Sequence, residues 1–115
     1  MIDMPAKLTL SAVEKSTIVI TASFHDEAGS PMIPSTISWS LLDEQGEVVN
    51  NRNDVVVEPS TSINIVLTGD DLDIKKNEIA ESRTCVISGR YNSSYGTDLH
   101  YSDSVFFQII SARRY

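Results

Sequence analysis

The chain has 115 residues and a formal net charge of −7, with 41% hydrophobic and 22% charged residues. This is the size and composition of one globular domain, so we expect a single domain over residues 1–115 rather than a disordered chain. An acidic surface repels phosphate, which argues against nucleic acid and anionic membranes as partners. With Cys85 as the single cysteine, no intrachain disulfide can form.

Alternation of apolar and polar residues, which is typical of half-buried strands, recurs along the whole chain. In chain order, the predicted strands cover residues 6–13, 17–24, 36–42, 54–58, 61–68, 83–92 and 104–110. The pattern is clearest in "TIVITASF", "TISWSLL" and "TSINIVLT" and weakest in the first and sixth segments. Turn residues separate the segments at intervals of about ten residues, which favours an all-β sandwich.

The acidic clusters "DEAGSP" and "DEQG" each follow a predicted strand, at residues 26–31 and 43–46. Asp bonds its own backbone and Gly accepts a positive φ, so we interpret both clusters as turns rather than as sites. Helix signals are confined to residues 69–82, which we expect to cross between the two sheets with one short helical turn.

Trp39 lies in the middle of the third predicted strand, the position at which immunoglobulin-like sandwiches keep their core tryptophan. We therefore predict an immunoglobulin-like antiparallel β-sandwich of about seven strands. The predicted core comprises Ile18, Ile20, Phe24, Ile37, Trp39, Leu41, Ile63, Ile65, Leu67, Ile87, Val105, Phe107 and Ile109.

Catalytic and metal-binding patterns are weak. The acids of "GDDLD" at residues 69–73 suggest calcium, but the spacing does not match a calcium loop, and a solvated loop is the favoured interpretation. His25 and His100 have no Cys or His at metal-ligand spacing and are expected at strand ends. Cys85 is interpreted as a core residue.

Because neither a nucleophile elbow nor a phosphate loop occurs in the sequence, we expect no enzymatic activity and no cofactor. The first ten residues do not resemble a signal peptide.

Two segments are candidates for partner binding. The stretch 91–103, "YNSSYGTDLHYSD", is predicted to be a loop before the last strand, and its mixture of Tyr, Ser, Asn and Gly is typical of binding loops. It contributes Tyr95, His100 and Tyr101. The edge strand at 54–58 contributes Val56, which we expect to face away from the core and to offer an exposed sheet edge. The alternative is that Val55 and Val57 complete the core and the flanking acids keep the edge soluble.

Several of these motifs together resemble the small immunoglobulin-like proteins encoded in structural gene clusters of tailed bacteriophages and prophages. The resemblance covers roughly residues 16–110. It is carried by the motifs at Asp26–Gly29, Ser38–Leu41, Asp43–Gly46, Leu67–Leu72, Gly89–Ser93 and Asp98–Phe107. At His100 the family pattern more often has an apolar residue or proline. The resemblance brings no catalytic residues with it.

The resemblance implies a non-enzymatic structural or assembly protein of the virion, present in the host cytoplasm during assembly. Its partners would be other virion proteins, and formation of a homo-oligomer stays open. The alternative is a surface adhesion or carbohydrate-binding module, which the tyrosine-rich stretch supports.

Overall fold

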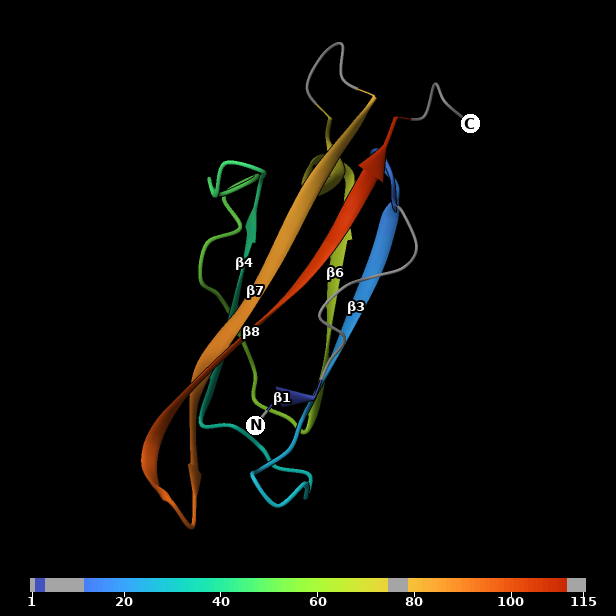
Figure 1. Cartoon of the computed structure of the whole chain (residues 1–115). Coiled ribbons are helices and arrows are strands. Elements are labelled where there is room, and N and C mark those ends of the chain that lie inside the picture. Colours follow the sequence, from blue (N-terminus) through green and yellow to red (C-terminus); the bar gives the residue numbers. More distant parts are fainter. Residues whose placement is uncertain (1, 4–11, 75–78, 112–115) are drawn as a thin grey trace.

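The structure, a computed structural model, describes residues 2–3, 12–74 and 79–111. Within these residues the chain forms eight strands and one short 3-10 turn, arranged as two sheets that enclose a core (Figure 1). The strands are β1 (Ile2–Asp3), β2 (Ala12–Val13), β3 (Thr17–Phe24), β4 (Thr36–Leu42), β5 (Val55–Val57), β6 (Ser62–Thr68), β7 (Ala80–Ser93) and β8 (Gly96–Ile110). The 3-10 turn, η1 (Gly69–Leu72), follows β6 where the crossover was predicted.

The smaller sheet has the order β1-β3-β6 and the larger sheet the order β2-β8-β7-β4-β5. This is the order of an immunoglobulin-like sandwich with an additional edge strand beside β4, so the predicted fold class is confirmed. One pairing differs from the prediction of a purely antiparallel sandwich, because β2 runs parallel to β8. The N-terminal part of the chain changes sheets: β1 pairs with β3, whereas β2 lies beside the last strand.

Alternation places the core as expected. β3 and β4 occupy the residues predicted for them, and β6 begins one residue later than predicted. Every predicted core residue is buried except Ile18, which is only partly buried and packs against the core from its margin. Most of the predicted first strand lies outside the described residues, which include only β2 of it.

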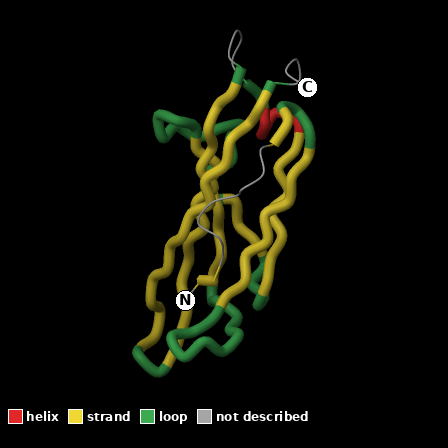
Figure 2. Tube along the Cα trace, turned by 45° about the vertical axis from the view of Figure 1, so that its right-hand side comes forward, coloured by secondary structure: helices red, strands yellow, loops and turns green. Residues whose placement is uncertain are grey.

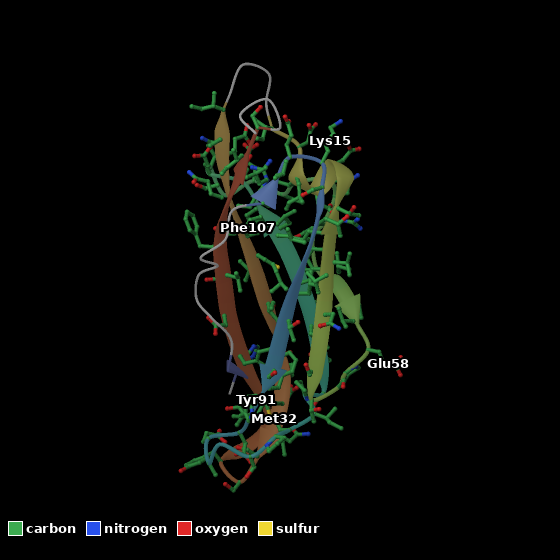
Figure 3. The ribbon with its side chains drawn as sticks, turned by 90° about the vertical axis from the view of Figure 1, so that its right-hand side faces the viewer. Lys15, Met32, Glu58, Tyr91 and Phe107 are labelled. Carbon is green, nitrogen blue, oxygen red and sulfur yellow. The ribbon has the colours of Figure 1, made fainter. Side chains whose placement is uncertain are left out.

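The main difference concerns the stretch 91–103, which is not a loop. It belongs to a long hairpin of β7 and β8 that reaches past the rest of the sandwich (Figures 1 and 2). Only Ser94–Tyr95 lies between the two strands. Tyr91 and Met32 lie toward this end of the molecule, and Lys15 lies at the other end (Figure 3).

Both acidic clusters are turns, as predicted. Asp26 Oδ1 accepts hydrogen bonds from the backbone N–H groups of Ala28 (2.9 Å) and Ser30 (3.0 Å). In the same way, Asp43 Oδ1 accepts hydrogen bonds from the backbone N–H groups of Gln45 (2.8 Å) and Glu47 (3.0 Å). The glycines of the two turns, Gly29 and Gly46, have φ of 86° and 81°, a conformation that favours glycine.

Candidate binding surface

The five-stranded sheet turns one face to the core and the other to solvent. Because side chains alternate along a strand, the residues between the buried ones of β4, β7 and β8 share the second face, which we call the outer face. β5 adds Val56 to it, and a single bridge to Leu42 adds Val48. The outer face includes Thr36, Ser38, Ser40, Leu42, Val48, Val56, Ser82, Thr84, Val86, Ser88, Arg90, His100, Ser102, Ser104, Phe106 and Gln108. None of these strand-paired residues is an acid, although the chain carries a net charge of −7. At the hairpin end of the face, Asp98 is ion-paired with Arg90.

Large apolar side chains are exposed on this face. Val56 is 84% exposed, Phe106 43% and Val48 42%. Val48 and Phe106 belong to one row across the sheet, which runs Val48–Leu42–Thr84–Phe106. Exposed apolar groups that gather on one face mark interaction surfaces more often than isolated ones do.

A second row, closer to the hairpin, is rich in serine. It runs Val56–Ser38–Ser88–Ser102, so the exposed valine of the edge strand is continuous with three small hydroxyl side chains. Such small side chains leave the sheet surface low, and a partner can approach it closely. The outer face therefore combines an apolar row with a flat, hydroxyl-bearing row.

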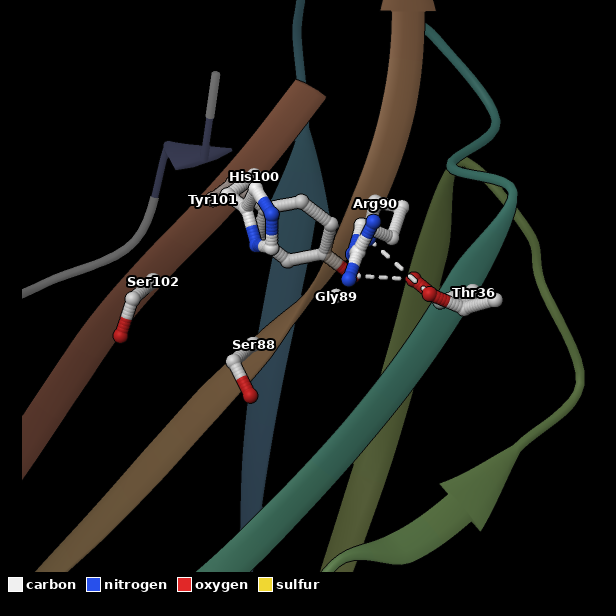
Figure 4. Close-up of a pocket in the computed structure, with 7 residues that line it drawn as sticks. All are labelled: Thr36, Ser88, Gly89, Arg90, His100, Tyr101 and Ser102. Atoms are coloured by element: carbon white, nitrogen blue, oxygen red, sulfur yellow. Dashed lines mark hydrogen bonds between the residues drawn. The ribbon is translucent and has the colours of Figure 1, made fainter. Parts of the chain in front are cut away.

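Beyond the serine row the outer face is hollowed (Figure 4). The hollow has a volume of about 480 Å³ and is lined by Thr36, Ser88, Gly89, Arg90, His100, Tyr101 and Ser102. Arg90 Nη1 donates to Asp98 Oδ2 at 2.7 Å, which leaves other N–H groups of the guanidinium for a ligand. A guanidinium, an imidazole and hydroxyls together suit carboxylates or sugar hydroxyls.

The structure brings two of the four predicted binding residues onto the outer face. Val56 faces away from the core as predicted, while Val55 and Val57 pack against the core, so both interpretations of this edge strand hold in part. His100 is exposed beside Arg90, inside β8 rather than at a strand end. That Val56 and His100 contact a partner stays a prediction.

Tyr101 differs from expectation, because its side chain belongs to the core and is only 8% exposed. Its hydroxyl donates to the carbonyl oxygen of Thr36 at 2.7 Å, and its ring meets Phe24 edge-on with 5.7 Å between centroids. Burial raises the pKa of Tyr101 to about 12. This side chain supports the floor of the hollow rather than projecting toward a partner.

Tyr95 lies at the tip of the hairpin and is 77% exposed. The base of the tip is tied to the turn after β3, because Tyr91 Oη donates to Glu27 Oε2 at 2.8 Å and Ser93 Oγ does so at 3.1 Å. The hydrogen bond to Glu27 raises the pKa of Tyr91. Tyr95 is thus presented on an anchored hairpin, at one end of the molecule and apart from the outer face.

The predicted calcium candidate has a different role. Asp71 is fully buried and bonds Arg52 Nε at 2.8 Å, so the expectation of a solvated loop is wrong for this residue. Asp70 and Asp73 lie 3.8 and 3.9 Å from Lys15 Nζ. In the described part of the chain, no group of three or more His, Cys, Asp or Glu side chains is placed to hold a metal ion.

Cys85 and His25 complete the chemical candidates. Cys85 is a fully buried core residue, as predicted, and burial raises the pKa of its thiol to about 12. A thiol in this state is a poor nucleophile near neutral pH. His25 follows β3 directly and is partly buried. Its backbone forms an isolated β-bridge with Pro31.

Comparison of the chain with protein-family models, with curated proteins and with solved structures found no match. Among the residues described by the structure, no helix has the length and apolar character needed to cross a membrane. The outer face was not evident from the sequence, because its rows join residues from four separate strands. Its one sequence signal was that Phe106 and Val56 alternate with core residues.

Proposed function

We propose that this chain is a non-enzymatic protein-binding domain that docks through the outer face of its five-stranded sheet. One observation carries the proposal: the strand-paired residues of the outer face include no acid in a chain of charge −7, and they expose Val48, Val56 and Phe106. The acid beside them, Asp98, is ion-paired with Arg90. Charge depletion and aromatic anchors are typical of the central part of protein interfaces.

The motif resemblance supplies the setting. In that setting the domain acts in a tailed-phage or prophage particle, as a structural or assembly component in contact with other virion proteins. It would be made in the host cytoplasm and carried in the virion. Small, stable sandwich domains suit such a role, because the face of a rigid sheet presents its contacts already ordered.

The test is co-expression with the products of the genes that neighbour the chain's own gene, read as co-purification and then as an affinity. Phe106→Glu and Val56→Lys each place a charge on the outer face and should weaken capture at least tenfold, which is about 1.4 kcal/mol. Val19→Lys is the matched control, because Val19 is 53% exposed but lies on the other sheet. Equal capture by all three variants, or no captured neighbour, contradicts the proposal.

A second function, carbohydrate binding, is favoured by the hollow alone. Arg90, His100 and the hydroxyls of Ser88 and Ser102 offer donors and acceptors to a sugar. Binding on a glycan array that Arg90→Gln abolishes and Phe106→Glu leaves intact would favour this function over protein docking.

A further inference from the structure

The smaller sheet ends in an edge strand, β6, that lacks the usual protection. β6 pairs with β3 on one side and with no other described strand. Its seven residues, "SINIVLT", include no charged residue, no proline and no glycine. The other edge strand discussed above, β5, is only three residues long and is followed by Glu58 and Pro59. Natural sheets generally shield long edges, so an unshielded one calls for a partner.

The hydrogen-bond register identifies which backbone groups of β6 face outward. At the two ends of the β3–β6 pairing, Phe24 N–H donates to the Thr61 carbonyl (2.9 Å) and Gly69 N–H donates to the Ser16 carbonyl (3.1 Å). Bonded pairs in an antiparallel ladder recur every second residue. The backbone groups of Ile63, Ile65 and Leu67 therefore face β3.

The backbone groups of Asn64 and Val66 consequently point away from β3, and no other described residue bonds them. The N–H groups on either side are already used. Ser62 N–H donates to Ser60 Oγ at 3.5 Å, and Thr68 N–H donates to Asp71 Oδ2 at 3.0 Å. The outward N–H groups that remain without a described partner are thus those of Asn64 and Val66, one on each side of Ile65.

We propose that β6 pairs with β6 of a second copy of this chain, antiparallel and about a two-fold axis at Ile65. In this register Asn64 of each copy lies opposite Val66 of the other. The backbone N–H and C=O groups of these residues then form four hydrogen bonds between the two copies. The unbonded N–H groups (Asn64 and Val66) and the bonded ones that flank them are arranged symmetrically about Ile65, as an isologous interface requires. The two three-stranded sheets then form one continuous sheet.

Charge and side chains agree with this occupant. Two chains of charge −7 repel, and an edge strand without charges is where they approach at least cost. Val66 is 51% exposed and pairs with Val19 on the solvent face of the smaller sheet. Because this contact is short compared with standard interfaces, we expect a reversible, concentration-dependent dimer.

The dimer would leave the outer face of each copy uncovered, since that face belongs to the other sheet. Two docking faces in one particle would bind a repetitive partner more tightly than one face does, without any new contact. The inference itself does not rest on the proposed function and stands or fails separately.

Sedimentation velocity over a range of concentrations tests the association. Val66→Pro removes one outward N–H and leaves the ladder to β3 intact, whereas Val66→Lys adds a charge at the edge. Either change should shift the dimerisation midpoint at least tenfold. Val19→Lys adds the same charge to the paired residue, away from the edge, and should shift it far less. Circular dichroism and the fluorescence of Trp39 confirm that each variant is folded.

Amide hydrogen exchange locates the contact. The amides of Asn64 and Val66 should exchange more slowly as concentration rises, while those of Ile63 and Ile65 are slow at every concentration. A monomer at all concentrations would overturn the proposal, and so would a dimer in which these two amides stay unprotected. Neither outcome bears on docking through the outer face, which is measured with different variants.

Discussion

At the scale of single residues, Asp71 is a fully buried carboxylate that accepts hydrogen bonds from three other residues. Burial opposes its ionised form, but Arg52, the N–H of Thr68 and Asn50 Nδ2 all donate to it, and together they lower its pKa. The Arg52 guanidinium also lies 6.0 Å from the centre of the Trp39 ring. This one carboxylate therefore ties the connection between β4 and β5 to the end of β6.

Asp71→Asn should destabilise the fold by about 3 kcal/mol, because it leaves a guanidinium without its buried counter-charge. The value is at the low end for buried pairs, since the Arg52 side chain is 38% exposed. A lowered folded pKa contributes stability above the unfolded pKa of about 3.9, and that stability is lost as pH falls through the folded pKa. Urea unfolding at pH 7 and pH 3 should therefore show the two proteins converging in acid.

Asp70→Asn is the matched control for this measurement. Asp70 is 71% exposed and its ion pair with Lys15 is 3.8 Å long, so its loss should be close to neutral. Equal destabilisation by the two substitutions would contradict the role given to Asp71.

At the scale of elements, the sequence was most informative where period-two alternation is strict. β3 and β4 were predicted to the residue, because their buried residues alternate with mainly polar ones, with Val19 as the exception in β3. The β7–β8 hairpin was missed beyond Asn92, because its residues are those that turns prefer. It is a strand pair because Tyr91 and Tyr101 face inward on neighbouring strands and pack 6.2 Å apart.

The outer face was predictable only in part, because most of its contacts join residues that are distant in the sequence. Three consecutive valines implied that one of them faces solvent, and Val56 does so. The pairing of Arg52 with Asp71 depends on how two distant connections meet, and no local pattern reports that. The same holds for the outer face, whose rows join β4, β5, β7 and β8.

Substitution of Gly89 tests how closely the β7–β8 hairpin packs against β4. A Cβ atom at this position would overlap the carbonyl oxygen of Thr36 and lie 2.6 Å from Tyr101 Oη. Gly89→Ala should therefore destabilise the domain by about 1–3 kcal/mol, measured by urea unfolding. Tyr101→Phe removes only the hydrogen bond to Thr36 and should cost about 1 kcal/mol. If Gly89→Ala were neutral, the close packing of β4 against the hairpin would be refuted.

At the scale of the whole molecule, the two sheets divide the surface by chemistry. The larger sheet presents an outer face on which the one acid, Asp98, is ion-paired with Arg90, and the smaller sheet ends in an uncharged edge. The acids lie largely in the turns and connections, where Asp26 and Asp43 organise the backbone. The two surfaces proposed for association are therefore those where the repulsion expected from a net charge of −7 is weakest.

The core also predicts how the whole domain responds to alkali. Burial raises the pKa of both Cys85 and Tyr101 to about 12. For a group whose folded pKa is raised, the stabilising contribution is complete below the unfolded pKa and is lost as pH rises through the folded pKa.

The unfolded pKa values are about 8.5 for cysteine and 10 for tyrosine, so the free energy of unfolding should fall between about pH 8.5 and 12. At pH 10.5, two pH units above the unfolded pKa of cysteine, the thiol alone should account for about 2.7 kcal/mol of that loss, at 1.36 kcal/mol per unit. Urea unfolding of the native chain and of Cys85→Ala at pH 7 and 10.5 isolates this term, because every other titrating group is shared. The variant should be less stable at pH 7 but lose about 2.7 kcal/mol less on going to pH 10.5. Equal losses would mean that the thiol ionises in the folded state and that the core admits water at Cys85.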